Sequence, residues 1–480
     1  MLHIRQKLPL QYKTLYRSLP AINLGVTRLI STRTSSLASV STSKGNNGAK
    51  ASEHYNPIFA SSAASVSSSS SKFWSHIPLA PADPILGITE DFNKDSNPRK
   101  INLSVGAYRD DLGEPFVLPS IKRASKILYE HESNKEYTGI NGSKNYNTLV
   151  KNFLFGHSDI GKQFIKENRI STSQSLSGTG ALKIAGEFLK NWSPYKSNII
   201  YLSNPTWANH INIFKNCGLT PKEYTYFNPE TNAINIDGLL EDLSNAAPGS
   251  SVLLHACCHN PTGLDPSRDD WNKIIEILSE RQLVPIIDIA YQGFQSSSLT
   301  KDLFLIDMIN EQIEAGKLPT ALICQSFAKN MGLYGERIGS FSIITPDSST
   351  TQAVDSQIKK LIRSIYSSPS IHGAKLVEIV LSDKSIYKQW EQDVVIMSDR
   401  IKEMRFVLYD LLKAKNPKSN WKHLINQNGM FCYTGLSKEQ ILRLKSEFSI
   451  YATLDGRFSI SGINKGNVEY LAEAIDQITR

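Results

Sequence analysis

The feature that most constrains the fold is the alternation of apolar segments with amphipathic helices between about residues 170 and 345. This pattern is typical of an α/β fold with a mostly parallel sheet. Helical periodicity dominates after residue 345, and the last part of the chain mixes short strands and helices, as in a smaller α/β lobe. The expected strands are 198–202, 251–256, 284–289, 321–325 and 339–344; the expected helices are 181–192, 271–280, 303–315, 355–366 and 388–412.

Length and composition agree with this pattern. A chain of 480 residues is too long for one simple core, so we expect two closely packed domains. The longest apolar runs, such as 252–258 and 284–290, are too short to cross a bilayer, so we expect no membrane-spanning segment. The five cysteines are scattered and give no disulfide framework, which favours a reducing compartment.

The net charge of +8 belongs to the N-terminal segment. Residues 1–72 contain nine Lys and Arg but only one acidic residue, Glu53, whereas residues 73–480 contain 44 basic and 44 acidic residues. A neutral body offers no basic excess for a phosphate backbone, so we expect no nucleic-acid partner.

The N-terminal segment has the composition of a mitochondrial transit peptide. Its first 52 residues lack acids and combine Arg and Lys with Leu, Ile, Ser and Thr. Residues 44–71 are rich in Ser, Ala, Asn and Gly, and we expect them to form an unfolded spacer. The alternative is a polar tail without a targeting role.

Polar residues follow four of the expected strands, at 203–210, 257–263, 288–291 and 326–330. Ligands of open α/β sheets bind outside the carboxyl ends of the strands, so these four segments predict one pocket.

Lys329 follows a buried strand, where burial would lower the pKa of its amine and make it nucleophilic. Arg337 offers a fork for a phosphate group. A lone lysine is more often a solvated surface charge, but the strand end and the nearby arginine weaken that interpretation.

Residues 177–180, Ser-Gly-Thr-Gly, precede an expected helix and could present free N–H groups to an anion; the alternative is an ordinary helix cap. Asp288 lies on a buried strand and needs a partner, which could be a cationic ring nitrogen, a salt bridge or a helix end. Residues 255–259, His-Ala-Cys-Cys-His, lack a fourth ligand for zinc, so we expect buried residues there and no metal.

These segments together resemble the aspartate aminotransferases, and the resemblance covers residues 73–480. The matching motifs are Ser-Gly-Thr-Gly-Ala at 177–181, Asn-Pro-Thr-Trp-Ala-Asn-His at 204–210, His-Asn-Pro-Thr-Gly at 259–263, Asp-Ile-Ala-Tyr-Gln-Gly-Phe at 288–294, Ser-Phe-Ala-Lys-Asn-x-Gly-Leu-Tyr-x-Glu-Arg at 326–337, Gly-Met-Phe-x-x-Thr-Gly-Leu at 429–436 and Asp-Gly-Arg-x-Ser at 455–459. Residues 73–87 resemble the start of the mature mitochondrial form.

The resemblance implies a fold-type-I pyridoxal-phosphate-dependent transferase. Its large domain holds a mostly parallel seven-stranded sheet, and its smaller α/β domain is built from both chain ends. The implied division is 1–72 for the transit peptide and spacer, 73–116 and 397–480 for the small domain, and 117–396 for the large domain. It also implies a homodimer whose subunits share their active sites, and it implies that the protein is located in the mitochondrial matrix.

The resemblance further implies roles around pyridoxal 5′-phosphate. Lys329 would bind the cofactor as a Schiff base and then move the proton, while Asp288 would pair with the pyridine nitrogen. His210 would support Asp288, Trp207 would pack on the ring, and Tyr291 and Asn260 would bind the ring hydroxyl. The implied phosphate ligands are Ser177, Gly178, Thr179, Ser326 and Arg337, with Tyr137 from the other subunit.

Substrate binding is implied in the same way. Arg457, Asn260 and the backbone of Gly106 would bind the α-carboxylate, and Arg363 of the other subunit would bind the side-chain carboxylate. On the residues alone, Arg363 would be a solvated cation of a helix. The chain departs from the family in having Tyr-Thr-Gly-Ile at 137–140 instead of Tyr-Leu-Pro-Ile, and Ser370 in place of a second proline.

The implied reaction is reversible transfer of the amino group from L-aspartate to 2-oxoglutarate, which gives oxaloacetate and L-glutamate. Two alternatives stay open: an aromatic aminotransferase on the same scaffold, and a non-catalytic cofactor-binding module. The regulators that contain such a module carry a helix-turn-helix, and residues 1–72 lack the apolar periodicity for one.

Overall fold

The computed structural model describes residues 73–79, 86–132, 134–193 and 195–480. The expected transit peptide and spacer at 1–72 lie outside these residues. Residues 73–79 belong to a unit separate from residues 80–480, and in it the rings of Phe73 and Trp74 meet edge to face at 4.8 Å. None of the described helices combines the length and apolarity that crossing a membrane would require.

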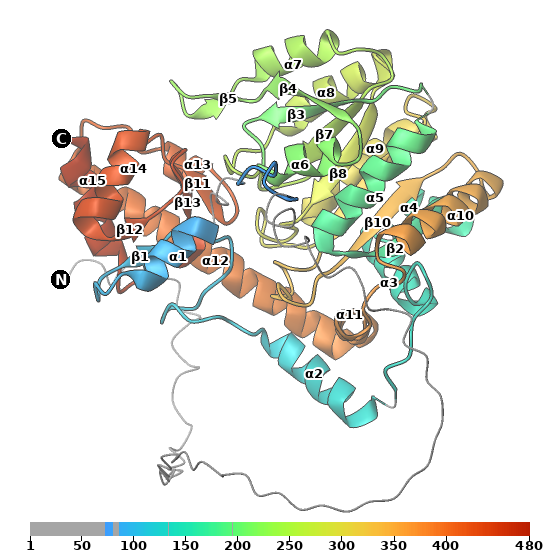
Figure 1. The fold of residues 1–480 in the computed structure, drawn as a ribbon, viewed down its shortest axis with the longest axis horizontal. Coiled ribbons are helices and arrows are strands. Elements are labelled where there is room, and N and C mark those ends of the chain that lie inside the picture. The colour runs from blue at the N-terminus through green and yellow to red at the C-terminus, as the bar shows by residue number, and fades with distance from the viewer. Residues whose placement is uncertain (1–72, 80–85, 133, 194) are drawn as a thin grey trace, which may run out of the picture. The chain divides into compact units, whose positions relative to one another are not determined.

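A seven-stranded sheet lies at the centre of residues 80–480 (Figure 1). In order across the sheet, its strands are β2 (Ile170–Leu176), β10 (Ile338–Ile344), β9 (Leu322–Ser326), β8 (Val284–Ile289), β7 (Ser251–His255), β3 (Ile199–Asn204) and β4 (Thr220–Thr225). The strands from β9 to β4 are parallel, and β10 is antiparallel to both of its neighbours. The mostly parallel seven-stranded sheet is therefore confirmed, and the five expected strands are present within two residues of their expected ends.

Two strands of this sheet were not expected from the sequence, because they lack an apolar pattern. The sequence of β2 is Ile-Ser-Thr-Ser-Gln-Ser-Leu, yet nearly all of it is buried. Several of its polar side chains bond to neighbouring elements: Ser171 to Asp355, Gln174 to Ser370, and Thr172 to Ser342, whose hydroxyls are 3.0 Å apart. The strand β4 has mostly exposed side chains at the opposite edge of the sheet. The strand β2 is thus buried with polar side chains that form hydrogen bonds, so a search for apolar runs does not detect it.

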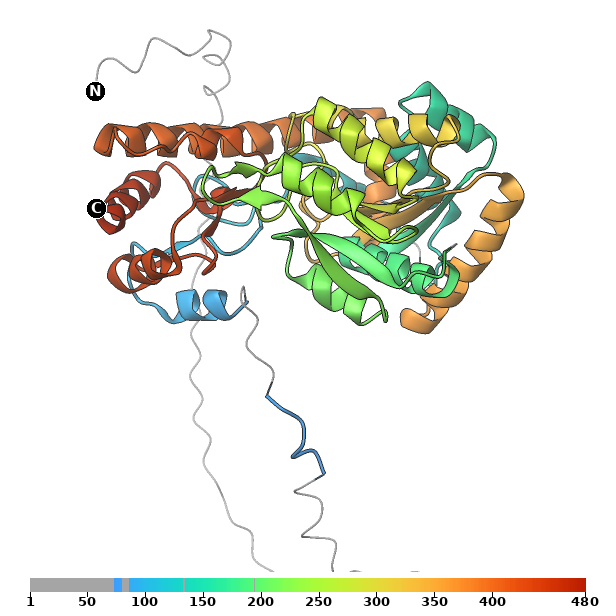
Figure 2. The same cartoon turned by 90° about the horizontal axis from the view of Figure 1, so that it is seen from above.

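Helices cover both faces of the sheet (Figures 1 and 2). Successive residues of the central strands belong to two different core clusters. Leu253 and Ile286 belong to the core cluster that includes α5 (Ser177–Trp192) and α10 (Ser348–Ile365). Leu254 and Ile287 belong to the other cluster. The helices α8 (Arg268–Glu280), α9 (Phe304–Glu314), α11 (His372–Ser382) and α12 (Lys384–Lys415) contribute to this second cluster.

One helix boundary corrects the sequence analysis. We expected α5 to begin at residue 181 after a Ser-Gly-Thr-Gly loop, but the helix begins at Ser177. Small residues and an early start bring the first turn close to the strand end, so residues 177–180 form the helix N-terminus itself. The other expected helices are present: α8, α10 and α12 begin three to seven residues before their expected starts, and α9 is one residue shorter at each end.

The N-terminal and C-terminal parts of residues 86–480 meet beside the sheet domain. The strand β1 (Ile101–Asn102) pairs in parallel with β12 (Ile450–Tyr451), and β11 (Phe431–Tyr433) pairs with β13 (Arg457–Ser459). Helices α14 (Lys438–Phe448) and α15 (Val468–Thr479) complete this lobe. The helix α12 contacts both α15 in the lobe and α2 (Pro119–His131), and it is continuous across the expected boundary at residues 396 and 397. The exact domain division stays a prediction.

Arg405 on α12 stabilises this lobe from inside. It is 3% exposed and donates hydrogen bonds to backbone carbonyls of the segment that leads into β11. The acceptors are the carbonyl oxygens of Leu424, Asn428, Gly429 and Phe431.

We expect Arg405→Met to lower the free energy of unfolding by about 3 kcal/mol, because it leaves several buried carbonyl groups without a donor. Urea unfolding of the cofactor-free protein measures this effect. The control is Arg123→Met on α2, whose side chain makes an exposed hydrogen bond to Ser385 and should change stability by less than about 0.5 kcal/mol. Equal effects of the two substitutions would contradict the role of Arg405.

Candidate active site

A cavity of about 230 Å³ lies at the carboxyl ends of the central strands. It brings together the four predicted strand ends, the first turn of α5 and residues of the lobe built from the chain ends. The residues that line it are Gly106, Ser177, Gly178, Thr179, Leu182, Trp207, His255, Cys257, Asn260, Asp288, Ala290, Tyr291, Ser326, Ala328, Lys329, Arg337, Phe431 and Arg457. All predicted site residues are among them except His210, Tyr137 and Arg363.

Lys329 lies just after β9, in the connection to β10. Its amine donates a hydrogen bond to the carbonyl oxygen of Gly106 at 2.7 Å and lies 4.9 Å from the ring centre of Tyr334. Burial lowers the pKa of the Lys329 amine to about 8, and the positive charges of Arg337 and Arg457 add to this effect. A larger share of the amine is therefore neutral, and nucleophilic, near neutral pH than in an ordinary lysine.

The first turn of α5 forms an anion site at one end of the cavity. Leu176, the residue that precedes the helix, makes no side-chain capping bond, so the first N–H groups of the helix remain available to a ligand. The hydroxyls of Ser177 and Ser326 are 2.8 Å apart. Arg337 reaches the same end of the cavity from the start of β10.

Gly339 allows the anion site to form. A Cβ atom at Gly339 would lie 2.3 Å from the carbonyl oxygen of Gln325 and 2.9 Å from Cα of Ser177. Only a glycine lets β10 approach both the neighbouring strand and the start of α5 so closely.

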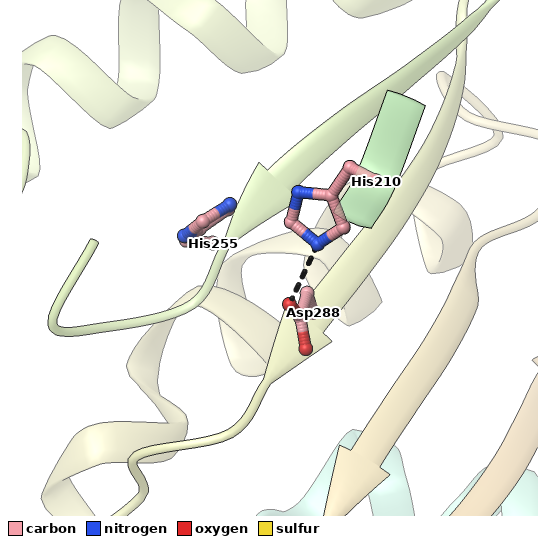
Figure 3. A group of neighbouring side chains, drawn as sticks. All are labelled: His210, His255 and Asp288. Atoms are coloured by element: carbon pink, nitrogen blue, oxygen red, sulfur yellow. Dashed lines mark hydrogen bonds and ion pairs between the residues drawn. The ribbon is translucent and has the colours of Figure 1, made fainter. Parts of the chain in front are cut away.

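Asp288 lines the cavity, and its carboxylate is bound by His210 (Figure 3). Nε2 of His210 is 3.3 Å from Oδ2 of Asp288, and Nδ1 of His210 is 2.8 Å from the hydroxyl of Thr206. If Nε2 donates to the carboxylate, Nδ1 accepts from Thr206, so this chain fixes the tautomer of His210. It leaves the other oxygen of Asp288 for a cationic donor in the cavity.

His255 lies beside this pair (Figure 3) and is a residue to which the sequence analysis gave no role in the pocket. Burial, followed by the charge of His210, lowers the pKa of His255 to about 3, so the ring is neutral. Its Nδ1 accepts from the backbone N–H of Asn260, which puts the proton on Nε2. That Nε2 has no partner among the described residues. Donor atoms of His210, His255 and Asp288 lie within 4.8 Å of one another, but the bonds of His210 are satisfied without a metal.

Arg457 occupies the end of the cavity formed by the lobe. It is 5% exposed and forms no ion pair with a described residue; burial lowers the pKa of its guanidinium. Its Nη2 donates to the carbonyl of Ser104 at 2.9 Å, and its Nη1 is 3.4 Å from Oδ1 of Asn260. A buried cation without an acidic partner is costly unless an anionic ligand binds it.

Phe431 is another residue that the sequence analysis did not assign to the site. The guanidinium of Arg457 lies 4.3 Å from the centre of its ring, and a Cβ at Gly106 would meet the same ring at 2.5 Å. The signal was the Gly-Met-Phe motif at 429–431, which resembled the family but carried no assigned role. Apolar lining residues such as Leu182 and Ala290 offered no signal in the sequence.

Tyr137 and Arg363 do not reach the cavity of their own chain. Tyr137 is 93% exposed. Arg363 is exposed in the last turn of α10. The resemblance to the family implies that both residues contribute to the site of a second subunit.

Comparisons with known proteins agree with this geometry. Residues 98–475 match the family described as aminotransferase class I and II. The chain is 46% identical over 413 residues to the mitochondrial aspartate aminotransferase of Dictyostelium discoideum, which covers 86% of this chain and 95% of that protein.

Solved structures show the same fold. The cytoplasmic aspartate aminotransferase of Saccharomyces cerevisiae superposes with a TM-score of 0.82 at 40% identity, over 85% of this chain and 99% of that one. An aromatic-amino-acid aminotransferase from Burkholderia pseudomallei, covalently bound to pyridoxal phosphate, gives a TM-score of 0.80 at 38% identity, over 85% of this chain and 100% of that one. A pocket with a nucleophilic lysine, an anion site and a buried carboxylate thus stands on a shared scaffold, and the chain belongs to the class I and II aminotransferases.

Proposed function

We propose that the protein is an aspartate aminotransferase, which moves the amino group of L-aspartate to 2-oxoglutarate and forms oxaloacetate and L-glutamate. The observation that carries this proposal is the cavity in which Lys329, with its lowered pKa, lies near Arg457, a buried cation that forms no ion pair with a described residue. The names of the relatives in Dictyostelium discoideum and Saccharomyces cerevisiae support the choice of substrate.

Pyridoxal phosphate is the cofactor of this family, and the residues of the cavity fit it. The free N–H groups of α5, Ser177, Gly178, Thr179, Ser326 and Arg337 would hold its phosphate. Asp288, oriented by His210, would pair with its ring nitrogen, while Trp207, Asn260 and Tyr291 would contact the ring. When bound, the cofactor supplies an electron sink that stabilises negative charge on the α-carbon of the amino acid.

The residues of the chain would do the rest of the chemistry. Arg457 and Asn260 would hold the α-carboxylate, and the backbone at Gly106 would close this side. The Nζ atom of Lys329 would act as the base that takes the proton from the α-carbon and later returns it, a role that suits an amine whose pKa is about 8. Burial raises the pKa of Tyr291, which keeps its hydroxyl protonated as a donor.

A homodimer would complete the site. Arg363 and Tyr137 are exposed and lie outside the cavity of their own chain, and a second copy would bring them to it. Arg363 would bind the side-chain carboxylate of a dicarboxylic substrate, and Tyr137 would reach the cofactor phosphate. An aromatic aminotransferase is the second candidate, because the similar Burkholderia pseudomallei structure has that name.

We also propose the mitochondrial matrix as the location, with residues 1 to about 70 as a removable targeting segment. The acid-poor, Ser-rich composition of this segment supports the proposal. The name of the mitochondrial relative in Dictyostelium discoideum agrees with it.

Our first prediction here concerns the effect of Lys329 on the stability of the cofactor-free protein. The pKa of its amine falls from 10.5 in the unfolded chain to about 8 in the folded chain. The charged amine therefore lowers the stability of the fold by its full amount below pH 8, and this loss of stability shrinks as the pH rises toward 10.5. Lys329→Met should therefore stabilise the cofactor-free protein by about 2 kcal/mol at pH 7.

Urea unfolding at pH 7 and pH 10 measures this difference, which should shrink at the higher pH. Lys360→Met on the exposed face of α10 is the control and should leave stability nearly unchanged at both values. A less stable Lys329→Met protein, or a gain that is the same at both pH values, would contradict the prediction.

The second prediction concerns the two carboxylates of the substrate. Removing one partner of a buried charge pair costs about 3–5 kcal/mol, or roughly two to four decades in kcat/KM. Arg363→Ala should cause a loss of this order for aspartate but a much smaller loss for alanine or phenylalanine, which lack the second carboxylate. Arg457→Ala should impair every amino acid, because all of them carry the α-carboxylate.

The measurement is kcat/KM of each variant with aspartate, alanine, phenylalanine and tyrosine. Equal losses for aspartate and alanine in Arg363→Ala would return Arg363 to a surface role. A wild-type preference for tyrosine over aspartate would favour the aromatic aminotransferase instead.

The third prediction concerns the targeting segment. Residues 1–72, fused to a fluorescent protein, should direct it to mitochondria, and the imported enzyme should have a new N-terminus near residue 70. N-terminal sequencing of protein from the organelle gives the cleavage site, and a fusion of residues 73–480 is the control. A full-length chain in the cytosol would contradict the proposal.

A further inference from the structure

The turn that follows Arg363 has an unusual residue at its tip. The helix α10 ends at Ile365, and the N–H groups of Tyr366 and Ser367 both donate to the carbonyl of Ile362, at 3.0 and 3.1 Å. Ser367 has a φ of +68°, the left-handed conformation in which helix ends usually place a glycine. A serine is strained there, so its side chain invites a functional explanation.

The hydroxyl of Ser367 holds the side chain of Arg363. Nη1 of Arg363 donates to Oγ of Ser367 at 2.5 Å. In the described part of the chain, Arg363 forms no ion pair, so its charge is free for a ligand. A long arginine side chain loses much rotamer freedom when it binds, and a hydrogen bond made beforehand reduces that loss.

The turn itself is fixed to the sheet. The hydroxyl of Tyr366 donates to the backbone carbonyl of Gln174 on β2 at 3.3 Å, and the side-chain amide of Gln174 donates to the carbonyl of Ser370 at 2.7 Å. Gln174 is completely buried. The hydroxyl of Ser367 is therefore presented from a turn that is tied down on both sides.

We propose that Ser367 is the positioning residue that orients Arg363 toward the second carboxylate of a dicarboxylic substrate, and that it thereby sets the preference for dicarboxylic over monocarboxylic amino acids. This inference rests on the proposed role of Arg363 in the site of the partner subunit. Because Ser367 acts through Arg363, its effect depends on a carboxylate that binds Arg363.

The test uses three single variants and one double variant of the full-length holoenzyme. Ser367→Gly removes the hydroxyl but suits the left-handed backbone, so a purely structural role predicts normal or higher stability and no change in substrate preference. We expect kcat/KM for aspartate to fall about fivefold to tenfold, mainly through a higher KM, while the value for alanine changes less than twofold. Ser367→Asn tolerates the same backbone and offers a side-chain oxygen, so it should recover most of the loss.

The third variant, Arg363→Ala, separates this inference from the function on which it rests. Adding Ser367→Gly to Arg363→Ala should cause no further loss for aspartate, because the two residues act together. If Arg363→Ala is selective for aspartate but Ser367→Gly affects aspartate and alanine equally, or neither, the role of Ser367 is overturned alone. If Arg363→Ala itself is not selective, the proposed substrate binding fails and the inference fails with it.

Discussion

The amine of Lys329 lies where burial and two guanidinium groups all oppose its protonation. Segments far apart in the chain create this environment. Strand β9 carries the lysine to the edge of the sheet, the return into β10 brings Arg337, and β13 supplies Arg457 from the lobe built by the chain ends. The carbonyl of Gly106, which follows β1, receives the hydrogen bond of the amine. The cofactor-free fold therefore carries an electrostatic cost at the place where reactivity is needed, which is a common trade between stability and function.

The cavity combines positive groups with one carboxylate. The first turn of α5, Arg337 and Arg457 supply the positive groups of the lining, and Asp288 supplies the carboxylate. Such a lining suits a bound ligand with two anionic groups and one cationic nitrogen. His210 orients Asp288 through a hydrogen bond. His255 lies beside them and adds no charge, because its low pKa keeps its ring neutral.

The sequence predicts most of the sheet and the cavity because strand ends of a parallel sheet converge on one edge. The strands β8 and β9 begin with apolar runs, and polar residues at or just after their carboxyl ends, such as Asp288, Ser326 and Lys329, line the pocket. Strand β2 escaped prediction because its buried side chains are mostly polar, and several of them, such as Thr172, bond to distant parts of the chain. Phe431 also escaped, since its role comes from its position under Arg457, which depends on the pairing of β11 with β13. Local patterns cannot encode such contacts between distant segments.

Gly339 shows how a residue that touches no ligand can limit the evolution of a site. It works as a spacer between β10, β9 and the start of α5, and even one methyl group there would press on Ser177 and on the backbone of Gln325. The displaced atoms would be those of the anion site, whereas the apolar core beneath could remain intact. A residue that does not contact the ligand can therefore still be intolerant of substitution. A position with no functional group of its own is restricted by the backbone around it, and redesign of the pocket has to keep a glycine at this point.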